Sequence, residues 1–295
     1  MQIVPETPAI KRNFEQNVAS VSNLGFFEQV WVQDTLHTNW VYLINQNQEI
    51  LLRLPLTKKW GLRAYLQPLF LREFSIRHIS NADFKALLQF LHGRAFVHLN
   101  FSLKRANNSS EVLSVGQGAT LKTGTFQILE WTQGIDQIRT VYSENVRRNL
   151  KKSKGLSLQN ISYAQFESFF TQEKGVNLGK LNRAAWQRLA TLTALAQEKN
   201  QSFIGGVYDQ DALVAVGLFF SYNGQLYFMK GTVNEAGKKK SALIFLIDTV
   251  LEKFADAHQS LDFVGSNQES IAAFYRKFGA KDAQYSIVKG RFPLV

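Results

Sequence analysis

The first part of the chain carries short apolar runs divided by polar breaks. Val30–Val32 and Trp40–Ile44 are rich in β-branched and aromatic residues, which favour strands. A polar break separates the second run from Glu49–Leu54, and this spacing predicts a hairpin. A helix is expected over residues 80–93, where apolar residues recur at helical spacing before a terminal glycine. A further strand is expected over Ala95–Phe101.

From about residue 136 the pattern changes to a regular succession of helices and strands. The expected helices are Asp136–Ser153, Tyr163–Phe170, Asn182–Glu198, Ser241–Ala257 and Glu269–Phe278. The expected strands are Leu156–Ile161, Ser202–Tyr208, Ala212–Ser221, Gln225–Thr232, Leu261–Val264 and a last pair near Gln284–Lys289. After the first helix the order is β-α-α-β-β-β-α-β-α-β. This order predicts a mixed α/β domain with a hairpin meander that leads into a βαβ crossover.

Length and composition narrow the class of protein. The chain has 295 residues, and a single hydrophobic core stops growing near ~250–300 residues, so two domains or one large domain are expected. Apolar residues make up 45% and include 23 Phe, which excludes a disordered chain. The absence of cysteine excludes a disulfide scaffold, a thiol nucleophile and cysteine-ligated metals. No histidine pair has metal-ligand spacing, so no metal site is expected.

Targeting signals and net charge indicate the expected cellular location of the protein and the kind of partner it binds. No apolar run reaches the ~20 residues of a membrane span, and the richest, Ala242–Val250, contains Asp248. No signal peptide is visible, so a soluble cytoplasmic protein is expected. The net charge of +11 favours polyanionic partners such as nucleic acid or phosphorylated carriers. A merely basic soluble protein is the alternative.

Residues 231–242, which read GTVNEAGKKKSA, form the first candidate binding segment. They lie between an expected strand and an expected helix that Ser241 can cap. Gly237 would let the backbone turn, and Lys238, Lys239 and Lys240 add positive charge beside the first amides of the helix. A phosphate or pyrophosphate would fit there. The alternative is that the lysines only solvate a loop.

A second basic segment, residues 145–154, contains no acidic residue. Its candidate ligand-binding side chains are Arg147, Arg148, Lys151 and Lys152. Helical spacing places three of these four on one face. A solvated helix face would explain that pattern. The presence of the lysine-rich residues 231–242 in the same domain nevertheless favours a phosphate-bearing ligand.

The end of the chain resembles a known superfamily. Asn267, Tyr275, Phe278 and Gly279 resemble the Asn and Tyr that precede Phe-Gly in the GCN5-related N-acetyltransferase (GNAT) superfamily, with one extra residue between Asn and Tyr. Residues 261–266, which read LDFVGS, resemble more closely the FemABX-like branch. That branch has tandem GNAT-like domains and includes tRNA-dependent aminoacyltransferases of peptidoglycan synthesis.

The resemblance implies two GNAT-like acyl-CoA N-acyltransferase domains in tandem. Residues 1–135 would form a degenerate N-terminal domain and residues 136–295 the domain with the active site. An amine would attack the acyl carbonyl directly, with no covalent enzyme intermediate. The backbone amides of Phe228, Met229 and Lys230 would hold that carbonyl. Tyr275 would protonate the leaving group, as a phenol with a reference pKa of ~10 suits a departing thiolate.

The resemblance also adds Asn267 to the catalytic residues and Ser266 to the substrate-binding residues.

Three functions stay open at this point. The donor would be acyl-CoA or aminoacyl-tRNA as a co-substrate, with an amine acceptor and no tightly bound cofactor. The single glycine of residues 235–242 departs from the CoA-binding loop, and Tyr275 stands where the tRNA-dependent enzymes carry Lys. An inert binding scaffold is the third reading, and the sequence leaves the oligomeric state open.

Overall fold

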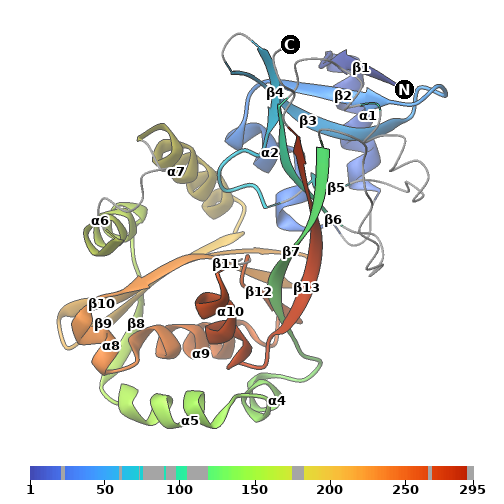
Figure 1. Cartoon of the computed structure of the whole chain (residues 1–295). Coiled ribbons are helices and arrows are strands. Elements are labelled where there is room, and N and C mark those ends of the chain that lie inside the picture. The colour runs from blue at the N-terminus through green and yellow to red at the C-terminus, as the bar shows by residue number, and fades with distance from the viewer. Residues whose placement is uncertain are drawn as a thin grey trace. The chain divides into compact units, whose positions relative to one another are not determined.

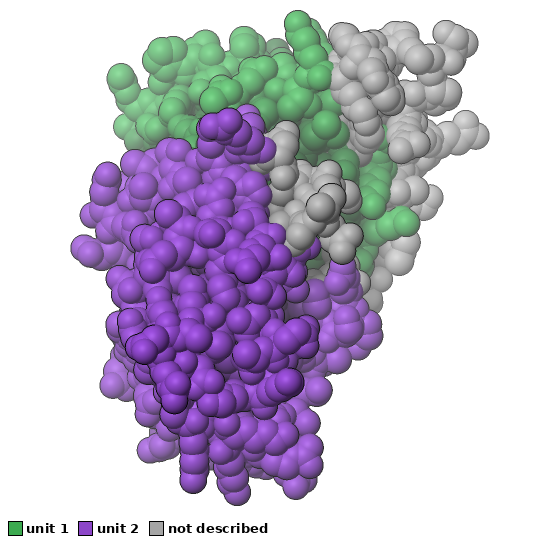
Figure 2. All heavy atoms as spheres, turned by 90° about the vertical axis from the view of Figure 1, so that its left-hand side faces the viewer, with its two compact units in different colours: residues 1–125, 284–295 green, residues 126–283 purple. Residues whose placement is uncertain are grey.

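The computed structural model describes residues 1–20, 24–59, 62–72, 74–75, 90, 98–104, 119–174, 183–264 and 268–290. Contacts within the chain divide it into two compact units (Figures 1 and 2). Unit 1 comprises Met1–Thr125 and Gln284–Val295, and unit 2 comprises Phe126–Ala283. The chain therefore passes from one unit to the other twice. The boundary expected from the sequence, between residues 135 and 136, falls later in the chain than the first of these passages.

Unit 1 is built on a sheet with two helices at its beginning. Its strands are β1 (Gln2–Pro5), β2 (Trp40–Ile44), β3 (Ile50–Lys59), β4 (Leu62–Leu66), β5 (Phe74–Ser75) and β6 (His98–Lys104). Its helices are α1 (Pro8–Ala19), the 3-10 turn η1 (Phe26–Glu28) and α2 (Val30–Leu36). The predicted hairpin is confirmed, because β2 and β3 pair antiparallel with Leu43 opposite Leu52. Tyr285–Gly290, the end of the last strand, pairs antiparallel with β6.

The predicted strand at Val30–Val32 is wrong, because these residues begin α2. The buried side chains of this segment include Val32 and Leu36, four residues apart, and Val30 and Gln33, three apart. That spacing is helical. A run of three β-branched and aromatic residues is too short to distinguish a helix from a strand by its period. The predicted helix at 80–93 lies outside the described residues except for Phe90, which is helical.

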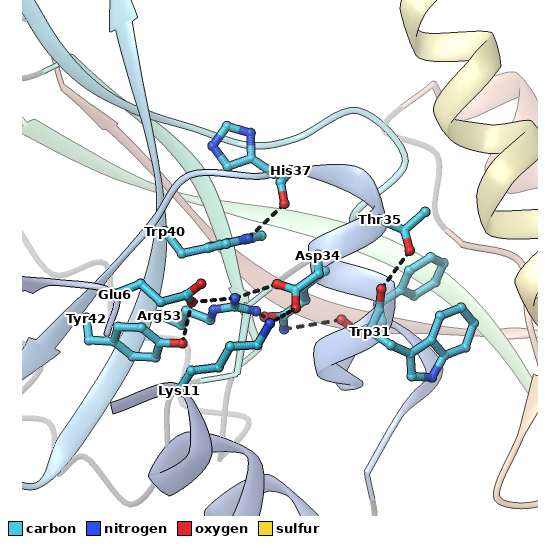
Figure 3. A network of polar contacts seen from close by, with 11 residues as sticks. Glu6, Lys11, Trp31, Asp34, Thr35, His37, Trp40, Tyr42 and Arg53 are labelled. Carbon is cyan, nitrogen blue, oxygen red and sulfur yellow. Dashed lines mark hydrogen bonds and ion pairs between the residues drawn. The ribbon is translucent and has the colours of Figure 1, made fainter. Parts of the chain in front are cut away.

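A buried arginine ties the start of unit 1 to its sheet (Figure 3). The side chain of Arg53, on β3, is 1% exposed and donates from Nη2 to Glu6 Oε2 at 2.7 Å and to Asp34 Oδ1. The Tyr42 hydroxyl donates to the same Glu6 oxygen at 2.7 Å. The guanidinium carbon of Arg53 lies 4.3 Å from the ring centroid of Trp40, a cation–π distance. The carboxylates of Glu6, just after β1, and of Asp34, on α2, are thereby neutralised by one cation of β3.

Unit 2 follows the predicted order closely. Its helices are α4 (Ile135–Thr140), α5 (Glu144–Leu150), η2 (Lys151–Ser153), α6 (Tyr163–Lys174), α7 (Arg183–Glu198), α8 (Glu235–Lys239), α9 (Ala242–Phe254) and α10 (Glu269–Arg276). Its strands are β8 (Leu156–Asn160), β9 (Ser202–Asp209), β10 (Ala212–Tyr222), β11 (Gln225–Val233) and β12 (Ser260–Asp262), with parts of β7 (Ala119–Glu130) and β13 (Lys281–Gly290). The strand order is β7-β12-β11-β10-β9-β8. Only β11 and β12 pair parallel among these. The mixed α/β prediction is confirmed.

Four details of unit 2 differ from the prediction. The helix expected over Asp136–Ser153 is divided, because the buried Tyr142 interrupts it and the Ser143 hydroxyl accepts from the Val146 amide to start α5. β7 was not expected, since its buried positions include the polar Gln127, which breaks the apolar alternation. The short helix α8 was also not expected. The last strand pair is one long strand, β13.

Helices cover both faces of the unit 2 sheet (Figure 1). α6 and α7 lie on one face, and α9 lies on the other beside α4 and α5. On α9, Leu246 and Val250, and likewise Ile247 and Leu251, are buried at a spacing of four residues. Burial of each such side chain contributes about 1.5–3 kcal/mol. In the described ranges of the chain, no helix is both long and apolar enough to cross a bilayer.

Candidate active site

β11 contains a bulge in the segment expected to hold an acyl carbonyl. Leu218 of β10 pairs with Lys230, and the next residue, Phe219, pairs with Phe228, so Met229 has no partner on β10. On the other side, the parallel pairing of β11 with β12 ends at Tyr227. A bulge interrupts the hydrogen-bond ladder and redirects backbone groups, and bulges are frequent next to active sites. Met229 therefore has no paired residue on either neighbouring strand, although β11 stays paired with β10 on both sides of it.

Helix α10 places Tyr275 beside this bulge. Its ring stacks on Phe263, with centroids 4.2 Å apart and an angle of 20° between the planes. The ring of Phe228 meets it edge-on at 6.3 Å. Burial raises the pKa of Tyr275 to about 12, so the phenol stays protonated at neutral pH and can donate a proton. The structure therefore brings together the strand segment 228–230 and Tyr275, which were predicted as site residues separately from the sequence.

The Lys230 side chain faces helix α6. Its ammonium lies 5.9 Å from the ring centroid of Phe170, and burial lowers its pKa. The sequence reasoning assigned a role only to the backbone of this residue. The sequence does show a lysine among residues 228–230, which are expected to hold the acyl carbonyl. The burial of its side chain could not be predicted, because it depends on α6, which is distant in the sequence.

The lysine-rich segment is largely helical. Asn234 caps α8, because its side-chain oxygen accepts from the Gly237 amide at 2.8 Å. Gly237 is buried within α8, where an added Cβ would lie 2.6 Å from the Val214 carbonyl oxygen and 2.7 Å from the Val233 side chain. Its role is close packing, and the predicted sharp turn at Gly237 is wrong. The left-handed residue is Ser241, with φ 58° and ψ 34°.

Gly237→Ala is expected to lower the free energy of unfolding of unit 2 by about 1–3 kcal/mol, since overpacking against a backbone carbonyl forces a shift of α8. Thermal and urea unfolding would measure it. Ala236→Lys, at the exposed neighbouring position, is the control and is expected to stay within ~0.5 kcal/mol of the native chain. Equal stability of the Gly237 variant and the control would contradict the packing role.

Two of the three lysines are used within the fold. Lys240 donates to Asp209 Oδ1 at 2.7 Å, and Lys238 pairs with Glu235 on the same helix. Among the residues that the structure describes, Lys239 forms no ion pair and its side chain is exposed. The positive charge open to a ligand at this segment is therefore smaller than the sequence suggests.

A hydrogen bond joins the lysine segment to the basic helix α5. The Ser241 hydroxyl donates to Asn149 Oδ1 at 3.2 Å. It makes no capping bond to α9, so the predicted side-chain cap is wrong. The exposed cations on α5 and η2 are Arg147, Arg148, Lys151 and Lys152. Within the described part of the chain these four side chains form no ion pair. The Ser241–Asn149 hydrogen bond therefore brings together two basic segments whose charge is partly open to a ligand.

The approach to Ser266 and Asn267 contains a strained residue. Ser266 and Asn267 themselves lie outside the described residues. Val264 has a positive φ of 53°, which is rare for a β-branched residue and costs about 1–3 kcal/mol. Its amide donates to Asp262 Oδ1 at 2.7 Å. Strain of this kind clusters at functional sites, and here it follows directly on Phe263, the stacking partner of Tyr275.

No group of three or more acidic or histidine side chains that could hold a metal occurs among the described residues. The side chains suited to a ligand are cationic and lie on α5, η2 and α8. They fit phosphate oxygens better than a metal ion.

Comparison with solved structures shows the fold. The chain is similar to the crystal structure of FemX, with a TM-score of 0.63, 11% identity and coverage of 97% of each chain. It is similar to a tandem GNAT protein from the clavulanic acid biosynthesis pathway, with a TM-score of 0.59, 11% identity and coverage of 100% of this chain and 99% of the other. For a GNAT-family acetyltransferase from Colwellia psychrerythraea the TM-score is 0.52 at 12% identity, with coverage of 99% and 100%.

These likenesses extend over whole chains, so the chain shares its fold with FemX and with the tandem GNAT protein, as the resemblance implied. No family model matches the sequence, and no curated protein matches it either.

Proposed function

We propose that unit 2 is an N-acyltransferase of GNAT type, which transfers an acyl group from acyl-CoA to an amine by direct attack. The observation that carries this proposal is the bulge at Met229 with the partly buried Tyr275 ring beside it. The fold alone does not carry it, because one fold hosts many activities.

The proposed reaction uses groups on both sides of the bulge. The acyl carbonyl would lie against the backbone amides of Phe228, Met229 and Lys230, which would stabilise the oxyanion of the tetrahedral intermediate. The neutral amine adds to the carbonyl carbon, the carbon–sulfur bond breaks, and the thiolate takes a proton from Tyr275. The nitrogen releases its proton to water, which completes the amide, and the Tyr275 phenolate takes a proton back from water. Asn267 and Ser266 remain proposed members of this site.

The donor phosphates would lie against the basic segments. Lys239 and the cations of α5 and η2 are exposed, and the Ser241–Asn149 hydrogen bond holds their segments together. Arginine is suited to hold a phosphate with two parallel hydrogen bonds. Glu144, at the start of the same helix, forms no ion pair with Arg147 or Arg148 in the described structure.

Removal of these cations is expected to weaken donor binding without loss of the fold. Arg147→Ala/Arg148→Ala should weaken CoA binding by about 1–3 kcal/mol, the range for a lost charge-assisted contact. Calorimetric titration with CoA and acetyl-CoA would measure this, and melting temperature would monitor the fold. Arg188→Ala is the matched control, an exposed arginine on α7 on the other face of the sheet. Unchanged affinity in the double variant would contradict the phosphate site.

An aminoacyl-tRNA donor is the second candidate, favoured by the net charge of +11 and by the cluster of exposed cations. Bulk tRNA would then bind with an affinity that falls steeply as salt rises, because neutralised phosphates release counterions. Saturable CoA binding without tRNA binding would support the first candidate. If neither ligand raises the melting temperature, the chain is better explained as an inert scaffold.

A further inference from the structure

The position of the Tyr275 phenol depends on two supports, and both lead to one buried residue, Gln127. The first support is Phe263, whose ring underlies that of Tyr275. The second is the orientation of α10, which carries Tyr275. β7, β12, α10 and the start of β13 lie close together in unit 2 (Figure 1).

Gln127 of β7 holds the first support through its backbone. The pairing of β12 with β7 reaches Asp262, which lies opposite Ile128. Beyond this point the Phe263 amide donates to the Gln127 carbonyl oxygen at 3.0 Å. This bond fixes the residue under the Tyr275 ring, one position before the strained Val264.

Gln127 holds the second support through its side chain. Its Nε2 donates to Asp282 Oδ1 at 3.1 Å. Asp282 accepts two hydrogen bonds from Arg276, from Nε at 3.0 Å and from Nη2 at 2.8 Å. Arg276 follows Tyr275 directly on α10. The paired fork is more directional than a single bond, so it restricts rotation of the end of α10.

Stability alone does not explain a glutamine at this position. Gln127 is 0% exposed, and its Oε1 has no hydrogen-bond partner among the described residues. A buried oxygen without a partner costs roughly 1–3 kcal/mol, so an apolar residue of the same size would suit the core better. Asp282 would keep both bonds from Arg276 if Gln127 were replaced.

From these contacts we infer that Gln127 is a positioning residue: its carbonyl holds Phe263, and its side chain, through Asp282 and Arg276, sets the orientation of the Tyr275 phenol. The inference rests on the proposed function for its effect on turnover. The geometry of Tyr275 that it predicts is independent of any activity.

The test replaces Gln127 by Met, which has a similar volume and no hydrogen-bonding amide. This variant keeps the backbone bond to Phe263, so it tests the support that passes through Asp282 and Arg276. Protein labelled with 3-fluorotyrosine gives a ¹⁹F signal for each of its 9 tyrosines, and Tyr275→Phe identifies that of Tyr275. In Gln127→Met the Tyr275 signal is expected to shift and broaden, while the melting temperature stays equal or rises. The kcat for acyl transfer is expected to fall about tenfold, which corresponds to 1.36 kcal/mol, with KM for the donor unchanged.

Thr193→Val is the matched control. Thr193 is fully buried on α7, where its hydroxyl donates to the Leu189 carbonyl, so this variant also removes a buried polar group of unit 2. It should leave the Tyr275 signal in place. An unchanged Tyr275 signal in Gln127→Met would overturn the inference whatever the turnover. A shifted signal in a protein that acylates no amine would support the positioning role and count against the proposed function.

Discussion

Tyr275→Phe is expected to lower kcat by about 10²–10³-fold, the lower part of the range for loss of a general acid. The variant keeps the ring that stacks on Phe263, so KM for the donor and the melting temperature should change little. Initial rates with acetyl-CoA and a panel of primary amines would give both constants. Loss of kcat at constant KM is the mark of a group that acts in the transition state.

Tyr163→Phe provides the matched control for this prediction. Tyr163 is a partly buried tyrosine of α6 whose hydroxyl donates to the Trp186 carbonyl at 3.2 Å, and burial raises its pKa too. Its variant should retain native kcat. A Tyr275 variant with native kcat would remove this residue from the mechanism.

The pH dependence of kcat should reflect the raised pKa of Tyr275. A general acid is lost as the pH rises through its pKa in the folded protein. Because that pKa lies at about 12, rather than at the ~10 of a free phenol, ionisation of Tyr275 should cause no fall in kcat up to about pH 10. An alkaline limb below that pH would come from another group.

Arg53→Met is expected to lower the free energy of unfolding of unit 1 by about 3 kcal/mol. It leaves Glu6 and Asp34 without their shared cation and removes the charge over Trp40. Loss of one partner of a buried ion pair costs about 3–5 kcal/mol. The lower end applies because both carboxylates are partly exposed, and Asp34 keeps its ion pair with Lys11. Thermal and urea unfolding, followed by tryptophan fluorescence, would measure the change.

Two further variants complete this test. Arg63→Met, at an exposed arginine of β4, should change stability by less than ~0.5 kcal/mol. Arg53→Lys should fall between the two, because lysine keeps the charge and loses the planar fork that reaches two carboxylates. If Arg53→Met behaved like Arg63→Met, the network in Figure 3 would be of little energetic importance.

The sequence predicted unit 2 better than unit 1 because its elements are long and clearly separated. Helix α9 shows its helical period within the element itself, and the three strands before it are long apolar runs divided by turn residues. The errors occurred where a distant contact decides the structure. β7 carries the buried Gln127, which is held by Asp282 far along the chain, and Val30–Val32 offered too few positions to define a period.

The candidate site was predicted in its residue types and only partly in its arrangement. Tyr275 could be named from its neighbours in the sequence, and residues 228–230 from their place on a strand. The bulge at Met229 could not be predicted, because it depends on the register of β11 against β10. The charge of the lysine segment was overestimated, since Lys240 pairs with Asp209, 31 residues earlier.

The double passage of the chain between the units has a consequence for how the protein is made. Synthesis proceeds from the N-terminus, and domains generally fold as units while the chain is still growing. All of unit 2, Phe126–Ala283, is contiguous and can fold as soon as it emerges. The sheet of unit 1 has to wait for Tyr285–Gly290, its partner for β6. The half of the protein that is synthesised first is therefore completed last, and its open strand β6 needs protection from wrong pairing until then.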